Sequence, residues 1–202
     1  MRLIEVFRSI QGEGPAMGRP ALFIRLSGCN LRCEGCDTDL KPSLDLSVRE
    51  LLERAEGEER RRVIITGGEP TLQMDELGDL IGGLHRLGLE IHIESNGTNI
   101  IPQETLERIH CAVISPKRGS NCNLPFWACK SNVHLKFVLG KPDWCWRDEE
   151  LTELISTLDR ERVWIMAYGA EQGMKNAIDA WNLALRLGVN YSDRLHIRLR
   201  QR

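Results

Sequence analysis

Residues 27–38 read SGCNLRCEGCDT and place Cys29, Cys33 and Cys36 within eight residues. Glycines interrupt this loop, so the three sulfurs can turn toward one point. Structural zinc takes four ligands, commonly from paired Cys-x-x-Cys knuckles, and neither a second knuckle nor a His pair follows nearby. An iron–sulfur cube on three thiolates keeps one iron for a molecule that is not protein. The spacing therefore indicates an incomplete metal centre; the alternative is three cysteines that are buried or hold zinc with a remote fourth ligand.

Length, composition and charge limit the class of protein. The chain has 202 residues, 42% of them hydrophobic and 28% charged, so we expect a single globular domain over residues 1–202. The formal net charge of -2 gives no indication of nucleic acid or a membrane surface as a partner. No apolar stretch approaches membrane-spanning length, and we expect a cytoplasmic protein.

Four further cysteines lie outside the loop: Cys111, Cys122, Cys129 and Cys145. Their irregular spacing suits free thiols in a reducing compartment better than a disulfide framework. A disulfide or a metal site at Cys122 and Cys129 stays open as an alternative.

Short apolar runs alternate with helical patterns along the whole chain. This alternation predicts a parallel sheet built from successive strand–helix units. The expected strands are residues 3–7, 21–26, 63–66, 90–94, 111–114, 133–139, 162–167 and 195–199. The expected helices are a capped one from Ser47 to about residue 55, one over residues 77–87, a short one after Pro102, one over 151–158, and a long one whose core face carries Met174, Ala177, Ile178, Trp181 and Leu185. The charged run 58–62 is expected to be a solvated helix end, and residues 118–132 a loop.

Four unusual segments each follow a predicted strand directly. They are the cysteine loop, Gly67-Gly68-Glu69-Pro70, Ser95-Asn96-Gly97-Thr98 and Ser115-Pro116-Lys117. In a parallel (β/α) barrel the carboxyl ends of the strands gather on one face, where such folds place their active sites. The order of the segments therefore predicts one functional face.

Several motifs resemble a known family. The C-x-x-x-C-x-x-C loop and the strand that ends in Gly-Gly-Glu-Pro resemble the radical S-adenosylmethionine (SAM) superfamily, whose fold is a full or partial (β/α) barrel. Five stretches together resemble its 7-carboxy-7-deazaguanine synthase family: IQGEG (10–14), ALFIRL (21–26), CDT (36–38), ITGGEP (65–70) and SPK (115–117). The resemblance runs from about residue 7 to residue 117. It implies an α/β fold, a partial (β/α) barrel with parallel strands and helices outside.

The resemblance also implies an activity and its cofactors. Members are lyases that convert 6-carboxy-5,6,7,8-tetrahydropterin to 7-carboxy-7-deazaguanine with loss of ammonia, in the queuosine pathway of tRNA modification. The implied cofactors are a 4Fe–4S cluster on Cys29, Cys33 and Cys36, SAM, and Mg²⁺ at Thr38. Implied partners are the pterin substrate, an electron donor such as flavodoxin or ferredoxin, and a second copy in a homodimer. No side chain is expected to be catalytic, because the cofactor carries the radical chemistry.

Binding residues follow from the same resemblance. The implied substrate contacts are Ile10, Gln11, Gly12, Arg25, Thr66 and the C-terminal carboxylate of Arg202. The implied SAM contacts are Gly68, Ser115, Pro116 and Lys117, followed by Met166, Ala167, Tyr168 and Gly169. Many members carry Gln-Pro at that last segment, and this chain does not. The simpler interpretations are an exposed strand end for Arg25, a cap for Thr38, and a solvated loop lysine for Lys117.

Two rival functions stay open. A glycyl-radical activating enzyme shares the cluster loop, Gly-Gly-Glu-Pro and the Ser-Asn-Gly stretch, but Gln11-Gly12-Glu13 and Ser115-Pro116-Lys117 speak against it. A non-enzymatic iron–sulfur or zinc module is the other, and methionine-dependent release of 5′-deoxyadenosine would exclude it.

Overall fold

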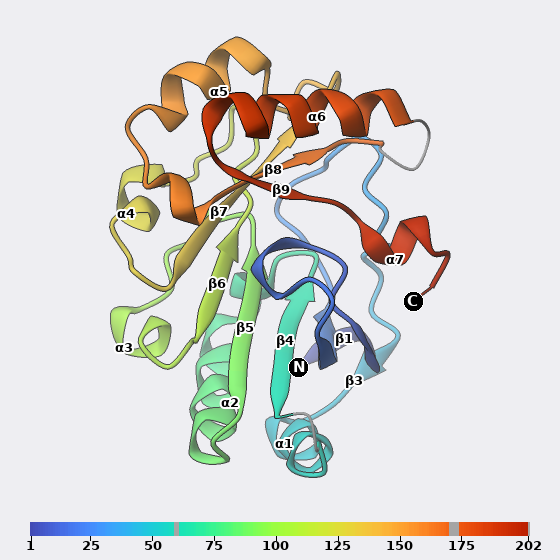
Figure 1. The fold of residues 1–202 in the computed structure, drawn as a ribbon. Coiled ribbons are helices and arrows are strands. Elements are labelled where there is room, and N and C mark those ends of the chain that lie inside the picture. The colour runs from blue at the N-terminus through green and yellow to red at the C-terminus, as the bar shows by residue number, and fades with distance from the viewer. Residues whose placement is uncertain (59–60, 170–173, 202) are drawn as a thin grey trace. The chain divides into compact units, whose positions relative to one another are not determined.

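A computed structural model describes residues 1–58, 61–169 and 174–201. The chain divides into two compact units, which are described separately. The first comprises Met1–Ser9, Pro20–Ser95 and Asn99–Ala112, and the second comprises Ile10–Arg19, Asn96–Thr98 and the chain from Val113 onward. The elements of both are labelled in Figure 1. The expectation of a single domain stays a prediction.

The first unit is built on a mostly parallel sheet in the order β3-β1-β2-β4-β5-β6. β2 pairs with β4 and β4 with β5 in parallel, whereas β1 pairs with β3 in antiparallel orientation. The strands are β1 (Arg2–Ile10), β2 (Pro20–Leu26), β3 (Leu44–Asp45), β4 (Arg62–Gly67), β5 (Glu90–Ser95) and the start of β6 (Cys111–Ile114). The helices are α1 (Val48–Glu56), the 3₁₀ turn η2 (Pro70–Gln73), α2 (Met74–Arg86) and α3 (Gln103–Leu106).

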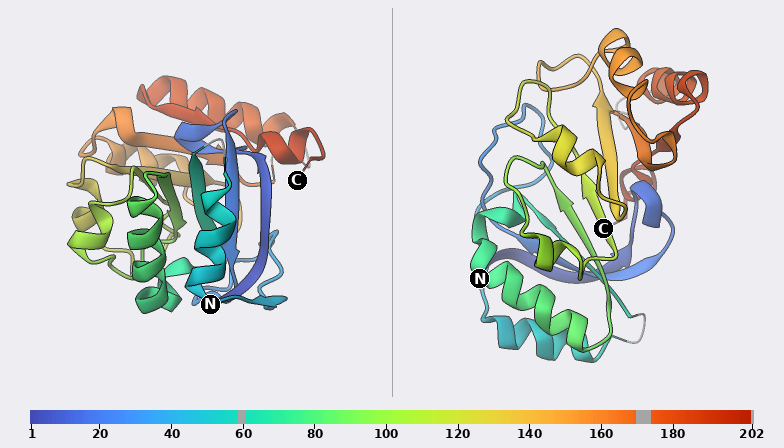
Figure 2. Two further views of the ribbon diagram at one scale, coloured as in Figure 1. Left: turned by 90° about the horizontal axis from the view of Figure 1, so that it is seen from below. Right: turned by 90° about the vertical axis from the view of Figure 1, so that its left-hand side faces the viewer.

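Local sequence signals set the ends of these helices as predicted. Ser47 accepts a hydrogen bond from the Glu50 amide, and the Glu50 side chain bonds back to the Ser47 amide, so both free donors at the start of α1 are satisfied. Gly88, with φ +68°, follows α2 in the left-handed conformation that glycine adopts without strain. α2 packs against α1 and β5, and Figure 2 shows α1 and α2 side by side.

The second unit continues from β6 in the order β6-β7-β8-β9. β7 (Val133–Leu139), β8 (Val163–Ala167) and β9 (Asn190–Ser192) pair in parallel. The helices are η1 (Gly14–Ala16), α4 (Leu124–Ala128), α5 (Asp148–Ile155), η3 (Arg160–Arg162), α6 (Met174–Leu187) and α7 (Leu195–Arg198). The strand order runs from β3 to β9 without closing in the part of the chain described, which confirms the α/β class with an open, mostly parallel sheet.

The charged run 58–62 is not a solvated helix end. Glu58 is buried and pairs with Arg8 at 2.8 Å, and Arg62 is buried at the start of β4, where it pairs with Glu90 at 2.6 Å. Oppositely charged partners that are distant in sequence neutralise Glu58 and Arg62, so these two side chains can be buried. Residues 59–60 lie outside the described part.

Residues 195–199 do not form the closing strand. β9 takes that place five residues earlier, and Leu195–Arg198 is the short helix α7. A short apolar run fits the periodicity of a strand and that of a helix equally well. Here tertiary contacts, and not the local pattern, determined that residues 195–198 form a helix.

The expected loop 118–132 contains α4. Asn123 caps this helix by accepting from the Phe126 amide at 3.2 Å. Trp127 is fully buried and donates its Nε1–H to the Gly97 carbonyl at 2.9 Å.

The buried face of α6 differs from the predicted one. Ala177 is buried as predicted, together with Ala180, Leu183 and Ala184. The larger members of the predicted face are exposed, namely Met174 (70%), Ile178 (50%), Trp181 (56%) and Leu185 (75%). The small side chains of the alanines allow α6 to lie close to β8, which it packs against.

Candidate active site

The cysteine loop begins directly after β2 in the first unit. Gly28 (φ +79°) and Gly35 (φ +69°) turn the backbone, and the Cys36 amide donates to the Cys33 carbonyl at 3.2 Å. Cys29 and Cys33 are half-buried and Cys36 is exposed. All three thiols are free of disulfides, so they are available as ligands.

The three cysteines supply the donor chemistry of an iron–sulfur cluster. Soft thiolates are the ligands that such clusters take, and in a cube each thiolate bonds a different iron. Over residues 1–58, 61–169 and 174–201, no three His, Cys, Asp or Glu side chains lie together as the ligands of one metal ion would. Cys122 and Cys129 do not form a disulfide with each other.

The Gly67-Gly68 pair lies against the start of the cysteine loop. The Gly68 amide donates to the Leu26 carbonyl at 3.1 Å, and the Glu69 amide donates to the Gly28 carbonyl at 2.8 Å. A Cβ atom on Gly68 would lie 1.9 Å from the Gly28 oxygen. Only glycine permits this approach, so the structure brings these two predicted segments together.

Glu69 ties the same segment to the end of β5. Its carboxylate is fully buried and accepts from the Thr71 amide (3.0 Å), Thr71 Oγ1 (2.7 Å) and Ser95 Oγ (2.8 Å). These three hydrogen bonds offset the cost of burying the carboxylate. Glu69 is therefore the residue that connects Gly-Gly-Glu-Pro to the Ser95 end of the next segment.

Arg25 and Thr66 stand directly opposite each other on β2 and β4. Arg25 Nε donates to Glu5 at 2.9 Å, and the guanidinium lies 5.7 Å from the centre of the Phe7 ring. With its side chain 25% exposed, Arg25 is not simply an exposed strand end. Neighbouring residues in register on parallel strands share one face of the sheet, so both side chains belong to one surface.

Glu94 is a neighbour of the candidate site that the sequence did not reveal. Thr66 Oγ1 donates to its carboxylate at 2.9 Å, which adds an acceptor to the surface that carries Thr66. Its position could have indicated it, because Glu94 lies on a predicted strand beside the one that ends at Thr66.

Thr38 lies half-buried at the end of the cysteine loop. Its hydroxyl donates to Asp37 Oδ1 at 3.3 Å. A hydroxyl and a carboxylate side by side are the hard oxygen ligands that Mg²⁺ prefers, so Asp37 joins Thr38 as a candidate.

The Gln11-Gly12-Glu13 stretch belongs to the second unit. Gln11 and Gly12 are buried, whereas Ile10 is 46% exposed. The Leu195 amide donates to the Gly12 carbonyl at 3.0 Å, and a Cβ on Gly12 would lie 2.1 Å from His196 Nδ1. The stretch therefore rests against the start of α7, which brings His196 to it.

Glu13 is held by two cations of the second unit. It forms an ion pair with Lys136 on β7 and lies 3.5 Å from Arg194. Burial alone raises the pKa of Glu13, but the charges of Lys136 and Arg194 outweigh it, and the net pKa is lowered.

This lowered pKa predicts acid-sensitive stability. The ionised carboxylate stabilises the fold above its ordinary pKa of 4.5, and that contribution is lost as the pH falls through the lower folded-state value. We expect Glu13→Gln to lower the free energy of unfolding by about 2 kcal/mol at neutral pH, with a difference from wild type that shrinks in acid. Urea titrations between neutral and acid pH measure the free energy of unfolding of each variant. The exposed Glu53, paired with Arg49, supplies the control Glu53→Gln, and an equal pH response in both variants would contradict the assignment.

Ser115-Pro116-Lys117 follows β6. Lys117 Nζ donates to the Ser115 carbonyl (2.8 Å) and to Ser115 Oγ (2.7 Å), so it is folded back rather than a solvated loop lysine. The Pro116 carbonyl accepts from Trp146 Nε1 at 2.8 Å.

The late segment consists of the last two residues of β8 and the two residues that follow, in the same unit. Met166 and Ala167 are buried, and the Tyr168 amide donates to the Leu139 carbonyl at 2.8 Å. Gly169 adopts φ +60°. Arg202, the remaining predicted contact, lies outside the described residues.

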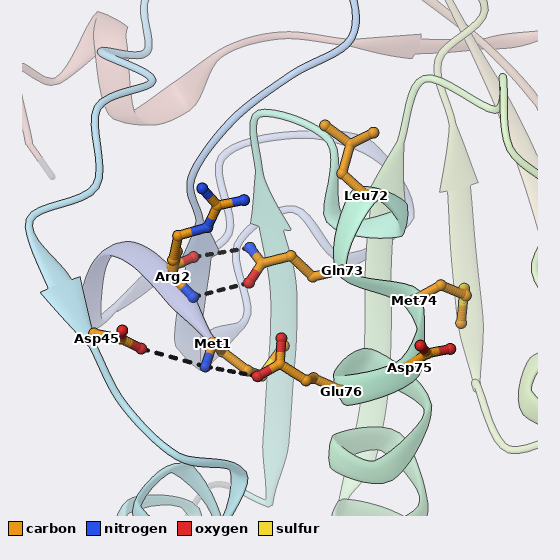
Figure 3. A pocket seen from close by; sticks show the side chains of 8 residues that line it. All are labelled: Met1, Arg2, Asp45, Leu72, Gln73, Met74, Asp75 and Glu76. Atoms are coloured by element: carbon orange, nitrogen blue, oxygen red, sulfur yellow. Dashed lines mark hydrogen bonds and ion pairs between the residues drawn. The ribbon is translucent and has the colours of Figure 1, made fainter.

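A surface cavity of about 490 Å³ in the first unit lies elsewhere. The Arg2 amide donates to Gln73 Oε1 at 2.8 Å, and Gln73 Nε2 donates to the Arg2 carbonyl at 2.9 Å, which closes one wall (Figure 3). The lining residues are Met1, Arg2, Asp45, Leu72, Gln73, Met74, Asp75 and Glu76. None is a predicted site residue, so this cavity is not the predicted site. Among the described helices, none has the length and apolar character needed to span a bilayer.

Comparisons with known proteins point to one family. Residues 23–112 match the model of the radical SAM superfamily. The chain is 38% identical to a 7-carboxy-7-deazaguanine synthase of Hyperthermus butylicus, over 98% of this chain and 92% of that one. A synthase of the same name from Pyrobaculum aerophilum is 33% identical, over 98% and 93%. The crystal structure of QueE from Escherichia coli matches with a TM-score of 0.75 at 24% identity, over 96% and 94%, and supports the fold. Near-complete coverage at this identity shows that the chain belongs to the 7-carboxy-7-deazaguanine synthase family of radical SAM enzymes.

Proposed function

We propose that this protein converts 6-carboxy-5,6,7,8-tetrahydropterin to 7-carboxy-7-deazaguanine with loss of ammonia, as a lyase of queuosine biosynthesis. The observation that carries this proposal is the near-complete match to synthases of that name, together with the cysteine loop packed on Gly67-Gly68. The comparisons do not favour a glycyl-radical activating enzyme, the rival function.

Cys29, Cys33 and Cys36 would hold the 4Fe–4S cluster. When bound, the reduced cluster with SAM supplies the 5′-deoxyadenosyl radical that removes a hydrogen atom from the substrate. The chain's own residues bind, orient and shield, so no side chain is assigned a catalytic role.

For SAM we propose contacts from Gly68 and from Ser115, Pro116 and Lys117, with Met166, Ala167, Tyr168 and Gly169 as a second segment. The close packing of Gly68 on Gly28 supports the contact from Gly68, because it fixes backbone atoms beside the cluster loop. The two hydrogen bonds from Lys117 to Ser115 support the contacts from the Ser115-Pro116-Lys117 turn, because they hold that turn rigid before any ligand binds.

For the substrate we propose that Arg25 binds the carboxylate, with Ile10, Gln11, Gly12 and Thr66 around the pterin. Glu5 and Phe7 fix the Arg25 guanidinium from two sides, which supports a pre-oriented donor. A planar guanidinium can present two parallel N–H groups to a carboxylate, which a lysine cannot do. The contact from the carboxylate of Arg202 stays a prediction.

Thr38 is proposed as the Mg²⁺ ligand. We expect Thr38→Ala to raise the Mg²⁺ concentration needed for half-maximal activity by about tenfold or more. The loss of one oxygen ligand lowers the affinity of the site for Mg²⁺. The cluster content should not change. Activity against Mg²⁺ concentration measures the effect. Thr157→Ala, which removes a hydroxyl bonded to the Leu154 carbonyl in α5, is the control. An unchanged Mg²⁺ response in Thr38→Ala removes Thr38 from the site.

We further propose, from the family resemblance, a cytoplasmic homodimer that receives electrons from a flavodoxin or ferredoxin. The exposed apolar side chains of α6 (Met174, Ile178, Trp181 and Leu185) support a second copy as one partner of this surface. Sedimentation velocity of the purified protein distinguishes a dimer from a monomer.

The decisive experiment incubates the reconstituted protein anaerobically with SAM, dithionite, Mg²⁺ and the carboxypterin. The expected result is the deazaguanine chromophore, a product of the correct mass that forms only when SAM is present, and released ammonia. Release of 5′-deoxyadenosine without that product would contradict the substrate. No SAM cleavage at all would favour a non-enzymatic module.

A further inference from the structure

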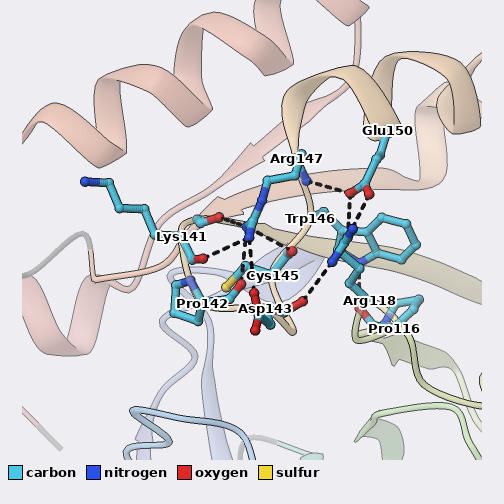
Figure 4. Close-up of polar contacts among 10 residues, drawn as sticks. Pro116, Arg118, Lys141, Pro142, Asp143, Cys145, Trp146, Arg147 and Glu150 are labelled. Atoms are coloured by element: carbon cyan, nitrogen blue, oxygen red, sulfur yellow. Dashed lines mark hydrogen bonds and ion pairs between the residues drawn. The ribbon is translucent and has the colours of Figure 1, made fainter.

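The loop between β7 and α5, residues 140–147, is closed by one side chain. Arg147, at the start of α5, donates its guanidinium to four carbonyl oxygens of this loop (Figure 4): those of Gly140, Lys141 (2.9 Å), Pro142 (3.2 Å) and Cys145 (3.3 Å). Its own amide donates to Glu150 at 3.1 Å. A planar cation with several bonded carbonyls holds a loop in one conformation.

This loop contacts the Ser115-Pro116-Lys117 turn. Trp146 Nε1 donates to the Pro116 carbonyl at 2.8 Å, and the Arg118 amide donates to the Trp144 carbonyl at 2.9 Å. Lys117 Nζ lies 5.6 Å from the centre of the Trp144 ring. Arg118 Nε also bonds Glu150 at 2.7 Å, the same carboxylate that accepts from Arg147. The turn is therefore held from the loop and from the first turn of α5.

The same loop contacts the end of β8 and the residues that follow it. Cys145 is fully buried against Met166, and the Trp144 ring meets the Tyr168 ring edge-to-face at 5.6 Å. A Cβ on Gly140 would lie 2.6 Å from Tyr168 Cβ. One loop therefore packs on both segments that are proposed to bind SAM, although neither contact was visible in the sequence.

We infer that residues 140–147 form a positioning loop that sets the SAM affinity of this enzyme, with Trp146 and Arg147 as its positioning residues. This inference rests on the proposed function, since it takes the SAM contacts from there. The two proposed SAM segments lie at the ends of different strands, β6 and β8, and the loop holds both at once. Loosening the loop therefore weakens SAM binding without touching the cluster ligands or the substrate residues.

The test compares Trp146→Phe with Trp164→Phe. Both side chains are half-buried indoles of the second unit, and each donates one Nε1–H bond, Trp146 to Pro116 and Trp164 to His134 Nδ1 at 3.2 Å. We expect Trp146→Phe to raise the Kd for SAM about three- to tenfold, the effect of one lost hydrogen bond, with the KM for the carboxypterin and the cluster content unchanged. Trp164→Phe should leave the SAM Kd as in wild type. Equilibrium dialysis with labelled SAM on the reconstituted protein measures both.

Hydrogen exchange supplies a readout that does not depend on SAM. The peptide that carries the Arg118 amide should exchange faster in Trp146→Phe than in Trp164→Phe, because its acceptor is the Trp144 carbonyl on the same loop. Arg147→Lys, which keeps the charge but loses the planar fork, should shift the SAM Kd and the exchange in the same direction. A double variant with Trp146→Phe should shift the Kd by less than the product of the two single effects, since both residues act through one loop.

The outcomes separate the two proposals. An unchanged SAM Kd in Trp146→Phe, or an equal shift in Trp164→Phe, overturns the positioning role while the proposed function stands. Faster exchange without a change in the SAM Kd overturns it as well. A wild-type protein that carries the cluster but binds no SAM overturns the proposed function itself.

Discussion

The Cys33→Ala variant is expected to lose both the broad cluster absorbance near the blue end of the spectrum and all SAM cleavage. Cys33 is the central member of the three cysteines that follow β2, none of which forms a disulfide. Two thiolates leave two iron corners of the cube without protein ligands, so the cluster should not survive purification. Iron and sulfide per chain, together with released 5′-deoxyadenosine, measure the loss.

Cys129→Ala is the matched control. Cys129 is an exposed cysteine outside the cluster loop; it lies at the C-terminal end of α4 and donates to the Phe126 carbonyl at 3.1 Å. We expect it to keep the full iron content and activity. A Cys33→Ala protein that still cleaves SAM would show that the ligand assignment is wrong.

Gly68→Ala is expected to disrupt the cluster loop, although Gly68 lies in the neighbouring Gly-Gly-Glu-Pro segment. The new Cβ would lie 1.9 Å from the Gly28 oxygen and 2.6 Å from its carbonyl carbon, and backbone atoms cannot rotate out of the way as a side chain can. Gly28 directly precedes Cys29, so the first ligand must move with it. We expect a loss of about 3 kcal/mol in the free energy of unfolding and a marked fall in reconstituted iron.

Gly78→Ala makes the same substitution where space exists. The nearest atom to its Cβ is Thr105 Oγ1 at 3.9 Å, and Gly78 lies inside α2, where alanine favours the helix by up to about 1 kcal/mol. Denaturant unfolding and iron analysis of both variants give the comparison. Equal stability and iron content in Gly68→Ala and wild type would contradict the packing described for this segment.

Much of the fold could be predicted from local sequence. The predicted strands 111–114 and 133–139 have the bounds of β6 and β7, because each is a short apolar run closed by residues that break a strand. The start of α1 was predictable because a capping box satisfies free amides within a single turn.

The wrong predictions share one cause, which is that distant contacts override local pattern. The exposed Trp181 and Leu185 look like core residues in the sequence, but alanines on the other face allow closer packing of α6 on β8. Glu58 and Arg62 look solvated until their partners Arg8 and Glu90 are known. Sequence alone does not specify which strands are neighbours.

In the candidate site too, some residues could be predicted from local sequence and others could not. The cysteine loop and Gly67-Gly68 could be predicted because their chemistry is contained in contiguous motifs. Glu94 and Trp146 could not, because the hydrogen bond that joins each of them to a predicted site residue spans 28 or 30 positions, to Thr66 and Pro116 respectively.

The open iron corner is tested most directly by electron paramagnetic resonance of the reduced wild-type protein, recorded with and without SAM. If Cys29, Cys33 and Cys36 are the only protein ligands, SAM binds the remaining iron, and the signal of the reduced cluster should change its shape when SAM is added. A cluster signal that SAM leaves unchanged, or a preparation that contains zinc in place of iron and sulfide, would contradict a cube held by three cysteines.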